Sequence, residues 1–236
     1  MIFDPPLISG QLIRRYKRFL SDIELESGEV VTAHVANPGA MLGLKDPGSK
    51  VLLSRSNNPK RKLQFSWEMI QIQKHWVGVN TLRPNQLAEE AITNGKIPEL
   101  QGFSSMRREV AYGKNSRIDI LLEDGHKSSF IEIKNSHLMR KKGVAEFPDS
   151  VTKRGLKHLD ELATLSAKGV RAVVLIVVQR EDCSTFTIAK DIDPAFGQAW
   201  ERARRSGVET LCYDCSLSRT EIVINNSMQI IDTETQ

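Results

Sequence analysis

Residues 116–135 read SRIDILLEDGHKSSFIEIKN, and this stretch decides the fold. Isoleucine and leucine alternate with charged residues on either side of an Asp-Gly pair, which is typical of two half-buried strands joined by a tight turn. In a hairpin that is symmetric about residues 125–126, Asp119 lies opposite Glu132. Because side chains alternate along a strand, Lys134 shares the face of Glu132. The stretch therefore predicts two carboxylates and one ammonium group at one place.

This set of side chains suits a divalent metal ion. Mg²⁺ keeps several waters and is held by one or two carboxylates plus substrate phosphate, while a nearby lysine can orient an attacking water. The hypothesis that follows has Asp119 and Glu132 as ligands of Mg²⁺ or Mn²⁺, with Asp119, Glu132 and Lys134 as catalytic residues, although such a spacing is also common by chance. The alternative is a cross-strand ion pair on a solvated sheet face, which would contribute roughly a few tenths of a kcal/mol.

Length and composition bound the class of protein. The chain has 236 residues, 40% of them hydrophobic, which suits one large or two small folded domains. No apolar run reaches the roughly 18–20 residues that span a bilayer, and the N-terminal MIFDPPLISG does not resemble a signal peptide. Three cysteines are too few for a disulfide framework, and Cys212-x-x-Cys215 lacks a second pair of zinc ligands. We expect a cytoplasmic protein with no membrane partner.

The first part of the chain, residues 1–83, alternates short apolar stretches with turn signals. Five strands are expected, at residues 11–19, 29–35, 50–54, 63–73 and 76–80. Five short strands of this kind predict a small barrel of the oligonucleotide-binding (OB) type.

This part also carries clustered cations, which predict contacts with nucleic-acid phosphates if they share a face. The residues concerned are Arg14, Arg15, Lys17, Arg18, Arg55, Lys60, Arg61 and Lys62. Tyr16, Phe65 and Trp67 lie among them and could stack on bases, although a place in the core is favoured for Phe65 and Trp67. The alternative for the cations is an ordinary solvated surface.

The second part, residues 84–236, has a different pattern. A helix is expected at residues 85–93, followed by strands at 106–112, 117–122 and 130–134. A second helix should end at Gly169, before a buried strand at 170–178. Asp193-Pro194 begins a third helix, and a strand follows at 208–213. This order predicts a mixed α/β sheet flanked by helices.

The order of these elements around Asp119 and Glu132-x-Lys134 resembles the core of the PD-(D/E)XK nuclease superfamily. The whole chain is also similar to the sugar fermentation stimulation protein A family. The segments that carry this second resemblance span nearly the full length: HVANPGAM (34–41), NPKRKL (58–63), WVGVNTLRPNQL (76–87), SRIDILL, IEIKN, FPDSVTKRGLKHLDEL (147–162) and IDPAFGQAWERARRSGVE (192–209).

The resemblance implies an α/β (α+β overall) protein, with an OB-like barrel followed by a PD-(D/E)XK nuclease-like domain. It also implies non-specific DNA binding and a regulatory role in maltose or related sugar metabolism. Ile118 stands where the superfamily often has proline before the aspartate. Superfamily members often carry an acid on the first helix, for which Glu90 is preferred over Glu89.

Three further residues follow the hairpin in the sequence. Arg154, Lys157 and His158 could reach a scissile or neighbouring phosphate, or could form a solvated helix face. Two functions therefore remain open at this point. The first, which is preferred at this point, is non-specific DNA binding, in which the nuclease-like domain contributes only fold and charge. The second is a nuclease that uses Mg²⁺ or Mn²⁺ to cut DNA or RNA.

Overall fold

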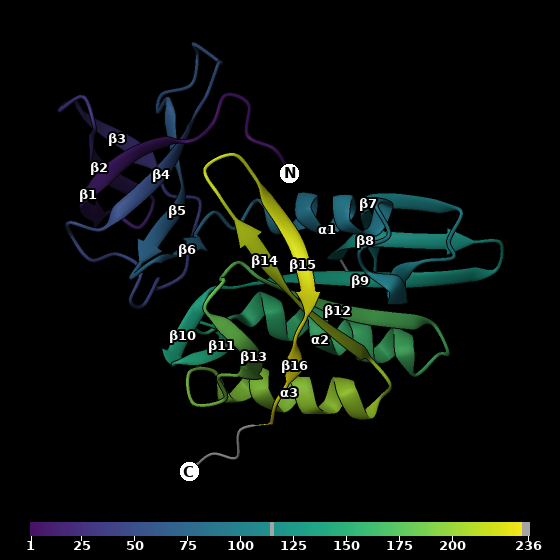
Figure 1. Ribbon diagram of the computed structural model, residues 1–236. Coiled ribbons are helices and arrows are strands. Elements are labelled where there is room, and N and C mark those ends of the chain that lie inside the picture. Colours follow the sequence, from purple (N-terminus) through teal and green to yellow (C-terminus); the bar gives the residue numbers. More distant parts are fainter. Residues whose placement is uncertain (114–115, 233–236) are drawn as a thin grey trace.

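The structure is a computed structural model that describes residues 1–113 and 116–232 (Figure 1). A small barrel formed by β1 to β6 stands at one end. A larger α/β part, built from the rest of the chain, holds the two main sheets and all three α-helices. The prediction of a small barrel followed by a mixed α/β domain is confirmed.

The barrel closes through a parallel pairing between β3 and β5, which completes the order β3-β2-β1-β4-β5. The sixth strand, β6, extends the sheet from β5. The strands are β1 (Ile8–Tyr16), β2 (Leu20–Leu25), β3 (Val30–His34), β4 (Lys50–Arg55), β5 (Phe65–Ile72) and β6 (His75–Gly78).

Strand β2 was not expected, and residues 11–19 do not form one strand. The chain turns back after Tyr16, and β1 pairs with β2 from Gly10↔Leu25 to Tyr16↔Leu20. The turn uses Lys17 and Arg18, whose φ angles are 46° and 65°. This left-handed region is usually occupied by glycine or asparagine in tight hairpins, so the sequence carries no recognisable turn signal here.

The barrel interior is apolar, and Trp67 lies in it. This side chain is fully buried, and its Nε1 donates to the carbonyl oxygen of Met69 at 2.8 Å. The assignment of Trp67 to the core is therefore confirmed. Phe65 is half-buried at the edge of the same core, with the guanidinium of Arg55 over its ring.

The larger part is built on a six-stranded sheet of order β15-β14-β12-β9-β8-β7. Its strands are β7 (Ser105–Tyr112), β8 (Ser116–Asp124), β9 (Lys127–Ser136), β12 (Arg171–Val178), β14 (Glu209–Leu217) and β15 (Ile222–Ser227). Strand β12 is parallel to both neighbours, β9 and β14. It is almost entirely buried, as its continuous apolar run predicts.

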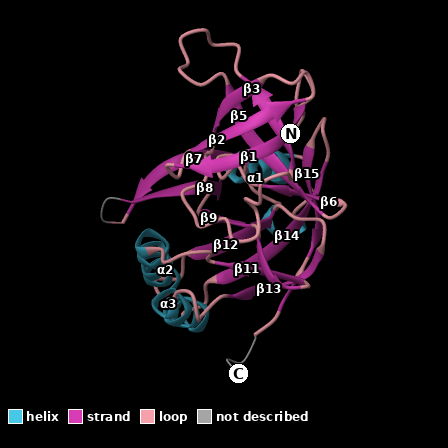
Figure 2. Ribbon diagram, turned by 90° about the vertical axis from the view of Figure 1, so that its left-hand side faces the viewer, coloured by secondary structure: helices cyan, strands magenta, loops and turns pink. Residues whose placement is uncertain are grey.

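Helices cover the two faces of this sheet (Figure 2). Helix α1 (Pro84–Thr93) packs Leu87 on the face that carries Ile131. Helices α2 (Lys153–Ser166) and α3 (Pro194–Arg205) pack Leu159 and Phe196 on the opposite face. A short 3-10 helix, η1 (Pro98–Leu100), follows α1. None of the helices among the described residues is long and apolar enough to cross a membrane.

A second, four-stranded sheet of order β10-β11-β13-β16 was not expected. Its strands are β10 (Leu138–Lys141), β11 (Gly143–Phe147), β13 (Cys183–Ile188) and β16 (Gln229–Ile230). They have two to six residues each, which is too short for an alternating pattern to stand out.

The cysteine pair of β14 does not form half of a zinc site. Cys212 and Cys215 are buried, and they pack into the two cores on opposite faces of the sheet. This placement follows from their three-residue spacing on a strand. Burial raises the pKa of both thiols, which keeps them protonated.

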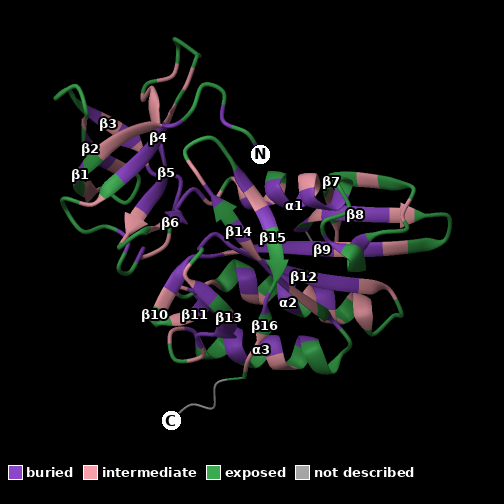
Figure 3. Cartoon of the chain, viewed as in Figure 1, coloured by how far each residue is buried: buried purple, intermediate pink, exposed green. Residues whose placement is uncertain are grey.

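The first seven residues pack on the larger part rather than in the barrel. Met1, Phe3 and Leu7 are buried in the core that α1 covers. The residues between them are exposed, and Figure 3 shows this first segment as mostly exposed. The N-terminal ammonium of Met1 donates to the carbonyl oxygen of Ile222 and to Oε1 of Glu90, both at 2.8 Å. The amino terminus thus fastens β15 to α1.

A buried carboxylate fastens the barrel to α1. Glu68 of β5 is fully buried and accepts from Nε and Nη2 of Arg83, at 2.9 and 2.5 Å. Ser54 and Asn80 donate to the same carboxylate at 2.6 and 2.9 Å. Because Arg83 is the N-cap residue of α1, this network sets the position of that helix relative to the barrel.

Candidate functional site

The β8–β9 hairpin has the register that its sequence predicts. Its pairs run from Asp124↔Lys127 to Ile120↔Ile131, so Asp119 comes next, across from Glu132. The backbone hydrogen bonds between β8 and β9 end before this pair, and a hydrogen bond to the side chain of Asp119 replaces them. Oδ2 of Asp119 accepts from the backbone N–H of Ile133 at 2.7 Å.

Glu132 lies beside Asp119, and its two oxygens have different surroundings. Oε1 accepts from Nζ of Lys134 at 2.5 Å and from Nδ1 of His158 on α2. Oε2 is buried and has no hydrogen-bond partner in the described structure. The side chain of Glu132 is 3% exposed and that of Lys134 is 11% exposed. A buried carboxylate oxygen without a partner is costly unless a cation binds it.

The pKa values of the two carboxyl groups are shifted in opposite directions. Burial raises the pKa of Asp119, and the neighbouring charge of Glu132 raises it further, against hydrogen bonds from Ile133 and Asn85. Burial also acts to raise the pKa of Glu132, but Lys134 and His158 outweigh it and hold that pKa below its usual range. A divalent cation between the carboxylates would relieve their repulsion.

The donor set fits a hard divalent ion that keeps some of its waters. Oδ1 of Asp119 accepts from Nδ2 of Asn85 at 2.8 Å, so each oxygen of Asp119 uses one of its two lone pairs. Oε2 of Glu132 uses neither. Within residues 1–113 and 116–232, no three His, Cys, Asp or Glu side chains form a closed metal cluster. Two carboxylates completed by water and phosphate oxygens are the arrangement Mg²⁺ prefers.

The acid on α1 needs a correction. Glu90, the preferred residue, binds the ammonium of Met1 on the side of the helix that faces β15. Asn85 is the α1 residue that contacts Asp119, and Glu89 lies one turn after it on the same side of the helix. Glu89 accepts from Arg108 of β7 at 3.0 Å. We therefore propose that Glu89, rather than Glu90, is the acidic residue of α1 that takes part in the site. The contact made by Asn85 carried no signal in the sequence.

Of the three residues expected on the helix after the hairpin, only His158 contacts the carboxylate pair among the described residues. His158 contacts Glu132 through Nδ1, and its Nε2 accepts from Nε of Arg154 at 3.4 Å. Nζ of Lys157 lies 3.7 Å from Oε1 of Glu161. His158 is buried, so it belongs to the carboxylate site rather than to a solvated helix face.

Several barrel cations hold the barrel's own structure. Arg15 donates through Nη2 to the carbonyl oxygens of Arg18, Asn37 and Gly39, at 2.8, 2.9 and 3.2 Å. Arg18 donates to the carbonyl oxygen of Pro38 at 2.8 Å. These two arginines therefore order the loop that follows β3.

Three more of these cations have partners, one of them Arg55 over the ring of Phe65, and three do not. Arg14 donates to Asp22 at 2.8 Å, and Arg61 donates to Ser66 at 2.7 Å. Three exposed lysine side chains have no partner among the described residues, and these are Lys17, Lys60 and Lys62. No described side chain therefore neutralises the charges of these three lysines.

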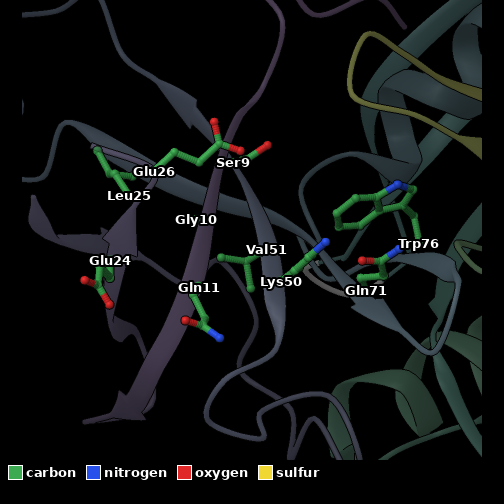
Figure 4. A pocket seen from close by; sticks show the side chains of 10 residues that line it. All are labelled: Ser9, Gly10, Gln11, Glu24, Leu25, Glu26, Lys50, Val51, Gln71 and Trp76. Atoms are coloured by element: carbon green, nitrogen blue, oxygen red, sulfur yellow. The ribbon is translucent and has the colours of Figure 1, made fainter. Parts of the chain in front are cut away.

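The barrel also has a hollow of about 580 Å³ on another part of its surface (Figure 4). Glu24 and Glu26 lie at one end of it and Trp76 at the other, with Lys50 between them. Two carboxylates against one ammonium would repel a phosphate backbone, so we do not place nucleic acid there.

Fold and site together define a class of protein in which an OB-like barrel precedes a mixed α/β domain with a buried carboxylate, Glu132, beside a half-buried one, Asp119. Residues 13–79 match the family description "SfsA N-terminal OB domain", and residues 82–221 match "Sugar fermentation stimulation protein RE domain". The chain belongs to the sugar fermentation stimulation protein family.

Relatives match along nearly the whole chain. A sugar fermentation stimulation protein homolog of Methylobacterium nodulans is 51% identical over 235 residues, covering 98% of this chain and 99% of the relative. A homolog of Brucella anthropi is 51% identical over 223 residues, with 94% and 96% covered. The solved structure of Pyrococcus furiosus SfsA in complex with Ca²⁺ is similar with a TM-score of 0.88 at 24% identity, covering 98% of each chain.

Proposed function

We propose that this protein is a metal-dependent nuclease that binds nucleic acid without sequence specificity. The observation that carries the proposal is Oε2 of Glu132, a buried carboxylate oxygen without a partner, beside Asp119. A surface that only binds DNA has no use for such an oxygen, because leaving it unsatisfied costs stability. A cation-binding site does need it.

Each residue has a distinct role in this proposal. Asp119 and Glu132 hold Mg²⁺ or Mn²⁺, which when bound would activate water and offset charge on the phosphate. His158 and Lys134 hold Oε1 of Glu132, which would leave Oε2 to bind the ion. The ammonium of Lys134 also orients the attacking water and stabilises negative charge that develops on the phosphate.

A related structure supports a hard cation. The Pyrococcus furiosus protein of the same fold was solved in complex with Ca²⁺. Ca²⁺ takes oxygen ligands, as do Mg²⁺ and Mn²⁺. We infer that this chain also takes a divalent cation of this kind at its carboxylate pair.

Cleavage is the test of this function. Purified protein with Mn²⁺ should cut DNA or RNA slowly, and EDTA should stop the reaction. Glu132→Gln, which keeps the side-chain shape, should abolish cutting because a neutral amide is a poor ligand for a hard cation. Equal cutting by wild type and by Glu132→Gln prepared in parallel would assign the activity to a contaminant and sink the proposal.

The second candidate function is nucleic-acid binding without hydrolysis, which the exposed barrel lysines favour. A nuclease would need the same binding as its first step. Replacing Lys17, Lys60 and Lys62 together by alanine should flatten the slope of log K against log salt on duplex DNA. The expected change is up to about 3 units, since each phosphate contact contributes roughly 0.9. Affinity for unrelated sequences should fall by similar factors, because phosphate contacts carry no sequence information.

The matched control removes three other exposed lysines, Lys96, Lys127 and Lys168. It should keep the wild-type slope. If both triple variants change the slope equally, the barrel lysines have no special role and nucleic acid binds elsewhere. The regulatory role in sugar metabolism stays a prediction.

A further inference from the structure

A second hollow, of about 510 Å³, lies between the β7–β8 hairpin and the first turns of α2. Figure 2 shows α2 beside the β7–β8 end of the sheet. Cations line the hollow from two elements, Arg117 from β8 and Arg154 and Lys157 from α2. Among the lining residues the structure describes, Glu109 is the one acid.

The charge of this hollow suits an anion with several oxygens. Guanidinium groups present planar forks that match phosphate oxygens, and these contacts are stronger than neutral hydrogen bonds. Arg154 and Lys157 also stand near the N-terminus of a 14-residue helix, where the helix dipole adds positive potential. The resident contact of Arg117 is weak, because it donates to the carbonyl oxygen of Glu109 at 3.3 Å.

His158 connects the hollow to the carboxylate pair. Its Nδ1 contacts Glu132, and the same ring lines the hollow beside Arg154. One imidazole ring therefore separates the two sites. Phosphates follow one another about every 3.4 Å along the axis of one strand in duplex DNA, so a strand with one phosphate at Glu132 carries another nearby.

We propose that this hollow binds a second phosphate of the nucleic-acid substrate, next to the phosphate at the carboxylate pair. Arg117 and Arg154 bind its oxygens, and Lys157 adds charge. This inference rests on the proposed function for its ligand. The side chains that line the hollow do not include the proposed metal ligands, so phosphate binding there can be tested without metal.

The first experiment measures binding of inorganic phosphate by calorimetry, in EDTA so that no metal takes part. The double variant Arg117→Gln and Arg154→Gln should bind phosphate about tenfold more weakly or worse, because two charge-assisted contacts are lost. Glu109→Gln should bind more tightly, because it removes the opposing charge. Glu109 is exposed, so this variant is expected to fold normally.

The control removes equal charge elsewhere, at Lys168 and Arg205, which are exposed and whose side chains have no partner among the described residues. This control should bind phosphate like wild type. If the Arg117 and Arg154 double variant also binds like wild type, the hollow is not a phosphate site. That result overturns the inference even if the Mn²⁺ and cleavage results hold.

Binding of short DNA strands, again in EDTA, shows whether the hollow takes the terminal phosphate of a strand or an internal one. If the hollow takes a strand end, wild type prefers a 5′-phosphorylated strand over the hydroxyl form, and the double variant loses that preference. If it takes an internal phosphate, the double variant weakens both strands by the same factor. Unchanged affinity of the double variant for both strands contradicts the assignment. A failure of cleavage with these binding results intact would overturn only the proposed function.

Discussion

Replacing Lys134 by methionine should lower the rate of metal-dependent cleavage by about 10²–10³-fold, the range for loss of one group that stabilises charge developing in the transition state. Methionine fills similar space without charge, and the side chain it replaces is only 11% exposed. Glu132 keeps its contact with His158, so its carboxylate stays in place. The rate is measured on a labelled oligonucleotide with saturating Mn²⁺.

Affinity separates the chemical role of Lys134 from a structural one. The Lys134→Met variant should bind Mn²⁺ and nucleic acid about as well as wild type, because the lysine acts on the reacting groups rather than on binding. Lys134→Arg keeps the charge and should retain part of the rate. A variant that loses metal affinity and rate together would show that Lys134 only positions Glu132.

Replacing Arg83 by methionine should destabilise the protein by about 3–5 kcal/mol, the usual cost of leaving one member of a buried ion pair alone. The partner left behind is Glu68, whose side chain is fully buried. Ser54 and Asn80 still donate to it, but neither carries a charge. The midpoint of urea unfolding, followed by tryptophan fluorescence, reports the loss.

A second change checks the cause. Adding Glu68→Gln to Arg83→Met removes the buried charge, and most of the lost stability should return. Ser54 donates to Oε1 and Asn80 to Oε2. The single amide oxygen can keep the bond from Asn80, and the Ser54 hydroxyl can turn to accept from the amide NH2. If the double variant is less stable than Arg83→Met alone, the guanidinium stabilises through packing rather than through charge.

The β8–β9 hairpin shows how much local chemistry can determine. Its Asp-Gly turn and its alternation set the register, so the amino-acid sequence is sufficient to place Asp119 across from Glu132. The long buried strand β12 and the capped helix α3 are likewise predictable, because periodicity and the Asp193 cap act within a few residues.

The features that local sequence does not predict depend on contacts between distant residues. Glu89 and Glu90 are neighbours in the sequence and look equivalent there. Glu90 is distinguished by its hydrogen bond with the ammonium of Met1, which is 89 residues away. Arg15 and Lys17 look alike as cations, yet Arg15 holds the loop after β3 through three carbonyl oxygens. Composition does not distinguish a cationic side chain that orders a loop from one that has no partner within the protein.

The measurement that tests the central claim most directly is an anomalous difference map from crystals soaked in Mn²⁺. We predict one strong peak within coordination distance of Asp119 and of Oε2 of Glu132, absent from crystals of Asp119→Asn. Retention of His158 and Lys134 on Oε1 of Glu132 should accompany it. A wild-type map with no peak at this pair would contradict the assignment of a metal site, as would a peak that persists in Asp119→Asn.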